Sequence, residues 1–159
     1  MSTTCIRILP YSFSDLIKTA KIITACGNDM YKKYGLSHWK NSLFKNLLIV
    51  YYTLFFKHTK IWGVYLNGFM VATFQTRISG QSLYFCKFAV NPDHSGHGIG
   101  GQCINTMIKI AKNNNLMTLS CEVLRENLHA LSFYQKRGFK NIGERTTLKY
   151  TEYALVKQI

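Results

Sequence analysis

Four of the six residues from Gly96 to Gly101 are glycine, and this turn lies between two segments of different periodicity. The run Ser82–Val90 is apolar and aromatic and predicts a strand, whereas Ile99–Lys112 carries apolar residues at helical spacing. Glycines leave backbone N–H groups uncovered, and a helix N-terminus adds partial positive charge, so the turn is suited to bind a pyrophosphate. The alternative is an ordinary loop whose glycines only allow a tight bend.

Two known phosphate-binding patterns can be compared with this turn. A P-loop needs Gly-Lys-Ser/Thr, and no lysine follows these glycines. The dinucleotide fingerprint G-x-G-x-x-G matches Gly96, Gly98 and Gly101, and Glu122 lies near the distance expected for the acidic residue that holds the ribose. That fingerprint normally opens a series of parallel β-α-β units. Here the turn lies past the midpoint of the chain, after hairpin-like strands, which disfavours a dinucleotide.

Two sequence blocks carry a family resemblance. Val90–Gly100 reads V-x-P-x-x-S-G-x-G-x-G, and Cys121–Phe139 reads as a strand followed by N-x-x-A-x-x-x-Y-x-x-x-G-F. In this order, with a helix of fitting length between them, they resemble the GNAT superfamily of N-acetyltransferases, which bind acetyl-coenzyme A. The resemblance covers roughly residues 69–142. Ser95 departs from the family pattern, which has Arg or Gln there, but the backbone N–H groups of the turn are kept.

The resemblance implies a fold class. We expect one domain over residues 1–159, of the α/β class with an α+β mixed sheet. The sheet is expected to be mostly antiparallel, flanked by about four helices, and splayed between the strands Ser82–Val90 and Met117–Val123. The length of 159 residues suffices for one domain with a substantial core.

The segments outside the two blocks can also be assigned from their patterns. Alternation and turn signals predict strands, among which Asn67-Gly68 is a strong hairpin turn because it needs positive φ. We expect further strands at Thr4–Leu9, Lys60–Asn67, Phe69–Ile78, Phe139–Glu144 and Thr147–Val156. We expect helices at Asp15–Cys26 (capped by Ser12 or Ser14 and ended by Gly27-Asn28), Leu43–Phe56 and Asn127–Arg137 (ended by Gly138).

The resemblance also implies which residues bind the coenzyme. Backbone N–H groups near Phe88–Val90 are expected to face the thioester carbonyl, and His94 and His97 are possible side-chain donors beside Ser95. The expected acetyl-coenzyme A residues are Phe88, Ala89, Val90, Ser95, Gly96, His97, Gly98, Ile99, Gly100, Gly101, Asn127 and Tyr134.

Three residues of the second block are candidates for catalysis or for cofactor contact. Tyr134 matches the position of a tyrosine near the coenzyme sulfur and is the expected general acid; core packing is its alternative role. Glu122 matches the general base of the ribosomal-protein N-terminal alanine acetyltransferases, with a structural or water-holding role as the alternative. Asn127 matches a residue that binds the pantetheine arm, and it can also cap the helix that it begins.

The acceptor region in GNAT proteins lies between the first helix and the second strand. Here that region contains Tyr31, Tyr34, His38 and Trp39. We expect Tyr31, Tyr34 and Trp39 to bind the acceptor, although each could equally form the underside of a helix. The scarcity of acidic residues argues against polyamine or aminoglycoside acceptors, so we expect a small amine, an amino acid derivative or a peptide N-terminus.

Charge limits the partners. The chain has a formal net charge of +13, from 20 Lys and Arg against 7 Asp and Glu, which favours anionic partners such as coenzyme A. The lysines are scattered rather than massed, so we do not expect nucleic acid. The alternative function is a regulatory module that binds coenzyme A or associates with nucleic acid and has no turnover. We expect a monomer or a homodimer.

Cysteines and apolar runs predict the compartment. The five cysteines are odd in number, contain no C-x-x-C pair, and fall in apolar segments, which indicates a reducing compartment. The first residues lack the apolar run of a secretory signal, and Leu43–Phe56 is too short to span a bilayer. We therefore expect a cytoplasmic protein without a membrane segment. His94 and His97 have no further ligands to complete a zinc site, so we expect no metal.

Overall fold

The computed structural model describes residues 4–9 and 12–159. The contacts divide the chain into two compact units, which are described separately: Met1–Arg77 with Lys87–Thr106, and Ile78–Cys86 with Met107–Ile159. The expectation of one domain stays a prediction. No helix of the described residues is both long and apolar enough to cross a membrane.

Among the described residues the strands follow the order β1-β2-β3-β4-β5-β7-β6. β4 and β5 pair in parallel, over Ser82–Tyr84 and Thr118–Ser120, whereas the β1–β2, β2–β3, β5–β7 and β6–β7 pairs are antiparallel. The mixed α/β class and the mostly antiparallel sheet are confirmed. The elements are β1 (Thr4–Ile8), α1 (Phe13–Tyr34), α2 (Leu43–Phe56), β2 (Lys60–Leu66), β3 (Phe69–Ser79), β4 (Ser82–Val90), the 3-10 helix η1 (Pro92–His94), α3 (Ile99–Asn113), β5 (Thr118–Leu124), α4 (Leu128–Gln135), β6 (Lys140–Thr146) and β7 (Thr151–Gln158).

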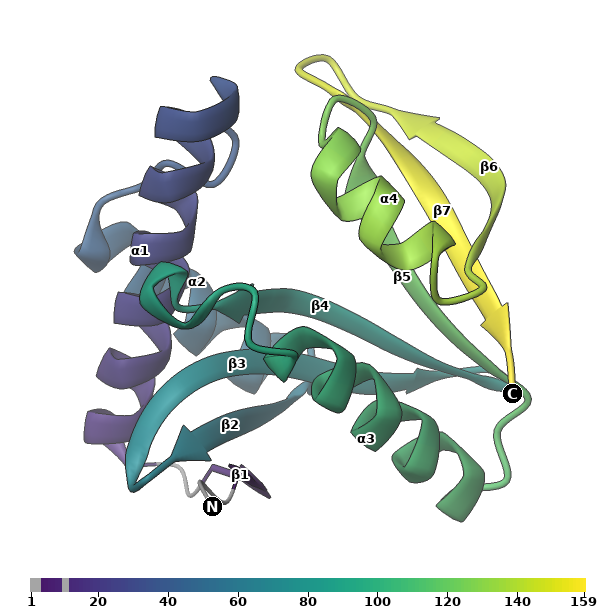
Figure 1. The fold of residues 1–159 in the computed structure, drawn as a ribbon, viewed down its shortest axis with the longest axis horizontal. Coiled ribbons are helices and arrows are strands. Elements are labelled where there is room, and N and C mark those ends of the chain that lie inside the picture. Colours follow the sequence, from purple (N-terminus) through teal and green to yellow (C-terminus); the bar gives the residue numbers. More distant parts are fainter. Residues whose placement is uncertain (1–3, 10–11) are drawn as a thin grey trace. The chain divides into compact units, whose positions relative to one another are not determined.

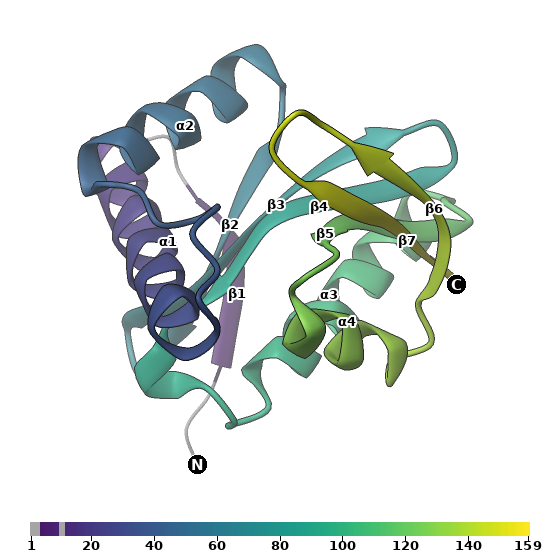
Figure 2. The ribbon, with the colours of Figure 1, turned by 90° about the horizontal axis from the view of Figure 1, so that it is seen from above.

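In the first unit, α1 and α2 pack together on one side of β1, β2 and β3 (Figure 2). Their apolar faces bury a core against the sheet, which stabilises both helices in a way that their propensities alone could not. The turn Asn67-Gly68 joins β2 to β3 with φ values of 50° and 83°, as the hairpin signal predicts. The core cluster consists of Leu9, Leu16, Ile22, Ile23, Val50, Leu54, Ile61, Tyr65 and Ala89.

The first helix extends further than the sequence predicts. Ser12 caps α1 by accepting the Asp15 N–H at 3.1 Å, but the helix continues through Gly27 to Tyr34 and is capped by Gly35, which has φ 71°. The expected stop at Gly27-Asn28 is therefore wrong. A Cβ at Gly27 would lie 2.2 Å from the backbone oxygen of Trp39. Gly27 thus permits a close approach of the following loop rather than ending the helix.

In the second unit, β5 pairs with β7 and β7 with β6, and α4 lies alongside them (Figure 1). Leu119 and Leu155 are fully buried, whereas every residue of the edge strand β6 is exposed. The ring of Tyr134 on α4 packs against Phe85 and Phe139, with ring centroids 5.8 and 5.2 Å away. This aromatic cluster holds α4 in place.

The cysteines are all free thiols, but they do not share one environment. Cys103 and Cys121 are buried, and Cys26 and Cys86 are half-buried. Cys5 is exposed on β1, so its place in an apolar segment does not bury it.

Candidate active site

The glycine-rich turn begins where β4 ends. The Asn91 N–H donates to the Val71 carbonyl oxygen at 2.8 Å, which ties the start of the turn to β3. Gly96 and Gly98 have φ values of 79° and 78°, and a Cβ at either position would have no atom within 4 Å. Since both positions are exposed, the two glycines leave an open, uncovered backbone surface.

The first turn of α3 follows directly. The Gln102 N–H donates to the Gly98 carbonyl oxygen at 3.1 Å, and the buried Ile99 anchors the helix start. The first N–H groups of any helix lack partners within it and carry partial positive charge. No acidic side chain in the first turn of α3 opposes an anion there. Nearby, His94 Nδ1 is buried and has no hydrogen-bond partner among the described residues.

The N–H groups that are expected to face the thioester carbonyl belong to the last residues of β4. Ala89 is buried in the core, and the Phe88 ring meets Phe74 edge-on at 6.3 Å. Burial raises the pKa of the Cys26 thiol to about 11, and the nearby Val90 backbone N–H lowers it by a smaller amount. Of the three expected N–H groups, that of Val90 therefore lies beside the Cys26 sulfur inside the unit.

Lys87 has an irregular backbone conformation within β4. Its φ is 49°, a left-handed value in the middle of a strand, where non-glycine residues are uncommon. Such strain of about 1–3 kcal/mol persists only where the surrounding structure imposes it, and it concentrates at functional sites.

In the second unit, the Glu122 carboxylate projects from β5. It accepts a hydrogen bond from the Tyr84 hydroxyl at 3.2 Å, and the Arg145 guanidinium lies 3.9 Å from its other oxygen. About a third of the Glu122 side chain is exposed. The arrangement orients a carboxylate that water can still reach.

Tyr134 and Asn127 lie on α4 and at its start. Tyr134 is 7% exposed, and its ring centroid also lies 5.2 Å from that of Phe133. The ring of Tyr134 therefore has the packing role that is its alternative. The Asn127 side-chain oxygen accepts the Ala130 N–H at 3.1 Å. Asn127 therefore caps α4, as one of its two expected roles requires.

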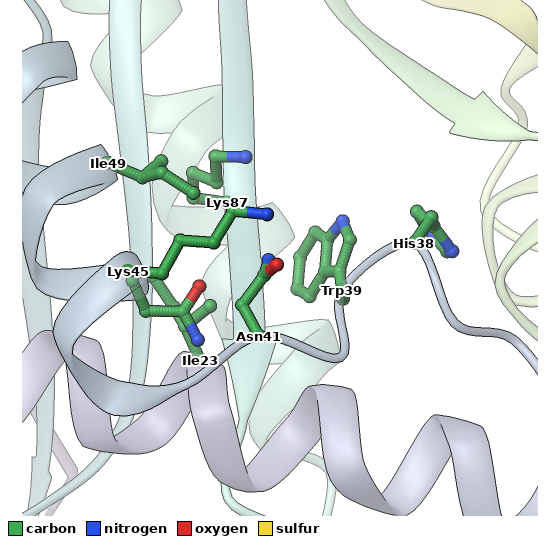
Figure 3. A pocket seen from close by; sticks show the side chains of 8 residues that line it. Ile23, His38, Trp39, Asn41, Lys45, Ile49 and Lys87 are labelled. Atoms are coloured by element: carbon green, nitrogen blue, oxygen red, sulfur yellow. The ribbon is translucent and has the colours of Figure 1, made fainter. Parts of the chain in front are cut away.

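A pocket of about 190 Å³ lies in the first unit, between α1, α2, β4 and the loop that follows α1 (Figure 3). Trp39 lines it, whereas Tyr31 and Tyr34 lie on α1, half-exposed, and are not among its lining residues. The amine of Lys40 covers the Tyr31 ring at 3.5 Å from the centroid. The pocket is lined by Ile23, His38, Trp39, Asn41, Lys45, Asn46, Ile49 and Lys87.

The sequence interpretation missed several residues of these sites. No motif in the sequence points to Lys45, Lys87 or Asn46, or to the two partners of Glu122. One signal exists for Lys87, which is the only charged residue in the apolar run Ser82–Val90. A lysine in such a strand needs an open space at its end, because burying an ammonium without a partner is costly.

The family model for the acetyltransferase (GNAT) family matches residues 28–139. This match covers both sequence blocks and the whole of the glycine-rich turn, and the chain therefore belongs to the acetyltransferase (GNAT) family. A curated relative, the uncharacterized N-acetyltransferase YobR of Bacillus subtilis (strain 168), is 42% identical over 58 residues. That match spans 36% of this chain and only 24% of the relative.

Solved structures share the fold. The ribosomal-protein-S18-alanine N-acetyltransferase from Escherichia coli aligns over 99% of this chain and 94% of its own, with a TM-score of 0.74 and 18% identity. The PaiA N-acetyltransferase from Thermoplasma acidophilum, solved in complex with coenzyme A, aligns over 99% of both chains, with a TM-score of 0.75 and 19% identity. At these identities the likeness shows the fold alone.

Proposed function

We propose that the protein is an acetyl-coenzyme A-dependent N-acetyltransferase that moves the acetyl group to a primary amine by direct attack in a ternary complex. The acceptor is a small molecule or a peptide N-terminus. The observation that carries the proposal is the open turn at Gly96 and Gly98, whose left-handed backbone and empty Cβ positions fit a bound diphosphate. Family membership and the coenzyme A complex of the Thermoplasma relative support the same cofactor.

The residues of the turn and of β4 hold the coenzyme in this proposal. The backbone N–H groups from Gly96 to Gly101 bind the pyrophosphate, with the Ser95 hydroxyl and His94 as further donors, whereas the Ser95 N–H already donates to the Pro92 carbonyl oxygen at 3.1 Å. The Asn127 amide nitrogen remains a donor for the pantetheine arm, since the helix cap uses only its oxygen. When bound, the coenzyme supplies an activated acetyl group and a thiolate leaving group. The N–H groups of Phe88 and Ala89 stabilise negative charge on the carbonyl oxygen.

Two side chains move protons. An alkyl ammonium has a pKa of about 10, so the acceptor must lose a proton before it can attack. Glu122 accepts that proton, directly or through water, and its contacts with Tyr84 and Arg145 fix the orientation of the carboxylate. Tyr134 donates a proton to the leaving sulfur, and the packing of its ring fixes the direction of its hydroxyl.

Thiol release tests the proposal. The purified protein is mixed with acetyl-coenzyme A and a panel of primary amines, and free thiol is followed over time. We expect release that depends on one class of amine. Tight binding of the coenzyme with no release across the panel would refute the enzyme proposal and favour a non-catalytic binding module.

A further inference from the structure

The pocket in the first unit is cationic. Two of its lining residues are lysines, two are asparagines, and none of the eight is acidic. Its remaining walls are the apolar Ile23 and Ile49 and the rings of His38 and Trp39. A pocket with this lining favours an anionic group attached to a small apolar body.

The two lysines are placed by separate elements. Lys45 lies in the first turn of α2, where its N–H donates to the Ser42 cap at 3.2 Å, while Lys87 stands at the strained position of β4. Figure 3 shows both amine ends directed to the same side, towards Trp39. The Lys87 amine lies 5.8 Å from the centroid of the Trp39 ring. Two like charges gathered in one pocket repel each other, and an anion between them relieves that repulsion.

The floor of the pocket is rigid. Asn46 is 2% exposed, and its side-chain amide donates to the Thr24 hydroxyl at 2.8 Å, which in turn donates to the Ala20 carbonyl oxygen at 2.8 Å. This chain of hydrogen bonds links α2 to α1 beneath the lysines. The loop that carries Trp39 is held as well, because its backbone packs on Gly27.

The size of the pocket limits its ligand. The pocket has a volume of about 190 Å³. Pockets for drug-sized ligands are larger, at about 300–1,000 Å³. The space fits a group of amino-acid size and excludes a folded protein surface.

We propose that this pocket binds the carboxylate of the acceptor through Lys45 and Lys87, so that the acceptor is an amino acid or a close derivative of one. The inference rests on the proposed function, and it narrows the acceptor from primary amines in general to amines that carry a carboxylate. Lys87 immediately precedes Phe88 and Ala89, which hold the thioester carbonyl in the proposed function. A carboxylate bound at Lys87 therefore keeps the amine of the same small molecule near the reacting group.

The test compares amines that differ only in the carboxylate. Binding is measured by calorimetry with and without saturating coenzyme A, for phenylalanine against phenylethylamine, histidine against histamine, and lysine against cadaverine. We expect the acid of at least one pair to bind about tenfold or more tightly than its decarboxylated partner. O-Phosphoethanolamine against β-alanine shows whether a phosphate serves instead; tighter binding of the phosphate would overturn the carboxylate assignment.

Variants of the two lysines locate the effect. Lys45→Met and Lys87→Met should each lower the preference for the acid about fivefold or more, since each removes a charge-assisted hydrogen bond. Lys45→Glu should reverse the preference and favour cadaverine over lysine. Lys21→Met, on the exposed side of α1, is the matched control and should leave the preference unchanged. Equal binding within every pair, or an equal effect of Lys21→Met, would overturn the proposal.

The binding measurement tests the carboxylate site and thiol release tests the enzyme proposal, so either proposal can be refuted without the other. A preference for acids without thiol release would refute the enzyme proposal and leave the carboxylate site standing. Thiol release from amines without any preference for acids would support the enzyme proposal and overturn the carboxylate site.

Discussion

Gly96 and Gly98 leave an open stretch of backbone at the turn before α3. Both hold a left-handed φ with no neighbour near the position of a Cβ. In the free protein, an alanine at either position would therefore meet backbone strain but no collision. In the complex, its methyl group would lie where the diphosphate is expected to approach.

Gly98→Ala separates these two effects. We expect the free energy of unfolding to fall by about 1–2 kcal/mol, the cost of a left-handed L-residue, and the Kd of coenzyme A to rise by more than about tenfold. Urea unfolding and calorimetry measure the two quantities. Gly68→Ala is the matched control, because Gly68 has φ 83° and an equally open Cβ position in the β2–β3 turn. A similar loss of affinity in Gly68→Ala would contradict the assignment of the turn.

Tyr134→Phe tests the proton donor. The change keeps the ring that packs against Phe85 and Phe139 and removes only the hydroxyl. We expect kcat to fall about 10²-fold or more, within the usual range for loss of a general acid, while the thermal midpoint changes little. Tyr153→Phe on β7 serves as the control. An unchanged kcat at saturating substrate would leave Tyr134 with its packing role alone.

At the scale of elements, the sequence predicts those helix and strand bounds that depend on residues close together in the chain. The bounds of α2 and β4 agree with the expected Leu43–Phe56 and Ser82–Val90, because each is a predominantly apolar run with polar residues on both sides. The end of α1 could not be found in this way. Gly27 looks like a helix stop in sequence, but in the structure its missing side chain makes room for the backbone of Trp39, a contact 12 residues away along the chain.

Gly27→Ala measures that contact. Alanine in an exposed helix normally stabilises it by about 1 kcal/mol relative to glycine. Here the new methyl group meets the backbone oxygen of Trp39, so we expect a net loss of about 1–3 kcal/mol, as for overpacked cores. The urea midpoint of Gly27→Ala is compared with that of Asn28→Ala, an exposed neighbour on the same helix. A Gly27→Ala variant as stable as the wild type would show that the loop can move away at little cost.

At the scale of the whole chain, the two motif blocks predicted the family and the sheet, but not the pocket. The motif residues lie close together in sequence, whereas the pocket combines Ile23, Trp39, Lys45 and Lys87 from four separate segments. Only tertiary structure brings such residues together. Tyr31 and Tyr34 illustrate the converse: they are near Trp39 in sequence, but the helix carries them away from the pocket lining.

Burial of thiol groups makes the stability of the fold depend on pH. Burial raises the pKa of Cys26 to about 11 and that of Cys103 to about 12, whereas a thiol in an unfolded chain ionises near pH 8.5. The folded state therefore keeps these protons longer, and the stability they contribute is complete below about pH 8.5 and is lost as pH rises towards 11–12.

Alkaline unfolding measures this loss. Under reducing conditions, the free energy of unfolding should fall by about 1.4 kcal/mol per pH unit for each thiol above pH 9. Urea titrations from pH 7 to 10.5 should show a shallower slope for Cys26→Ala than for the wild type, with pH 7 as the reference. An identical slope would mean that the Cys26 thiol is accessible to hydroxide in the folded state.

The contact at Gly27 also bears on how readily the pocket could be redesigned. The main chain of Trp39 lies against Gly27, whereas its indole lines the pocket and packs against the core cluster. A mutant library at position 39, with Gly27 left untouched, would keep the main-chain contact and vary the pocket lining, and its stable members should be those that keep a large apolar side chain at this position.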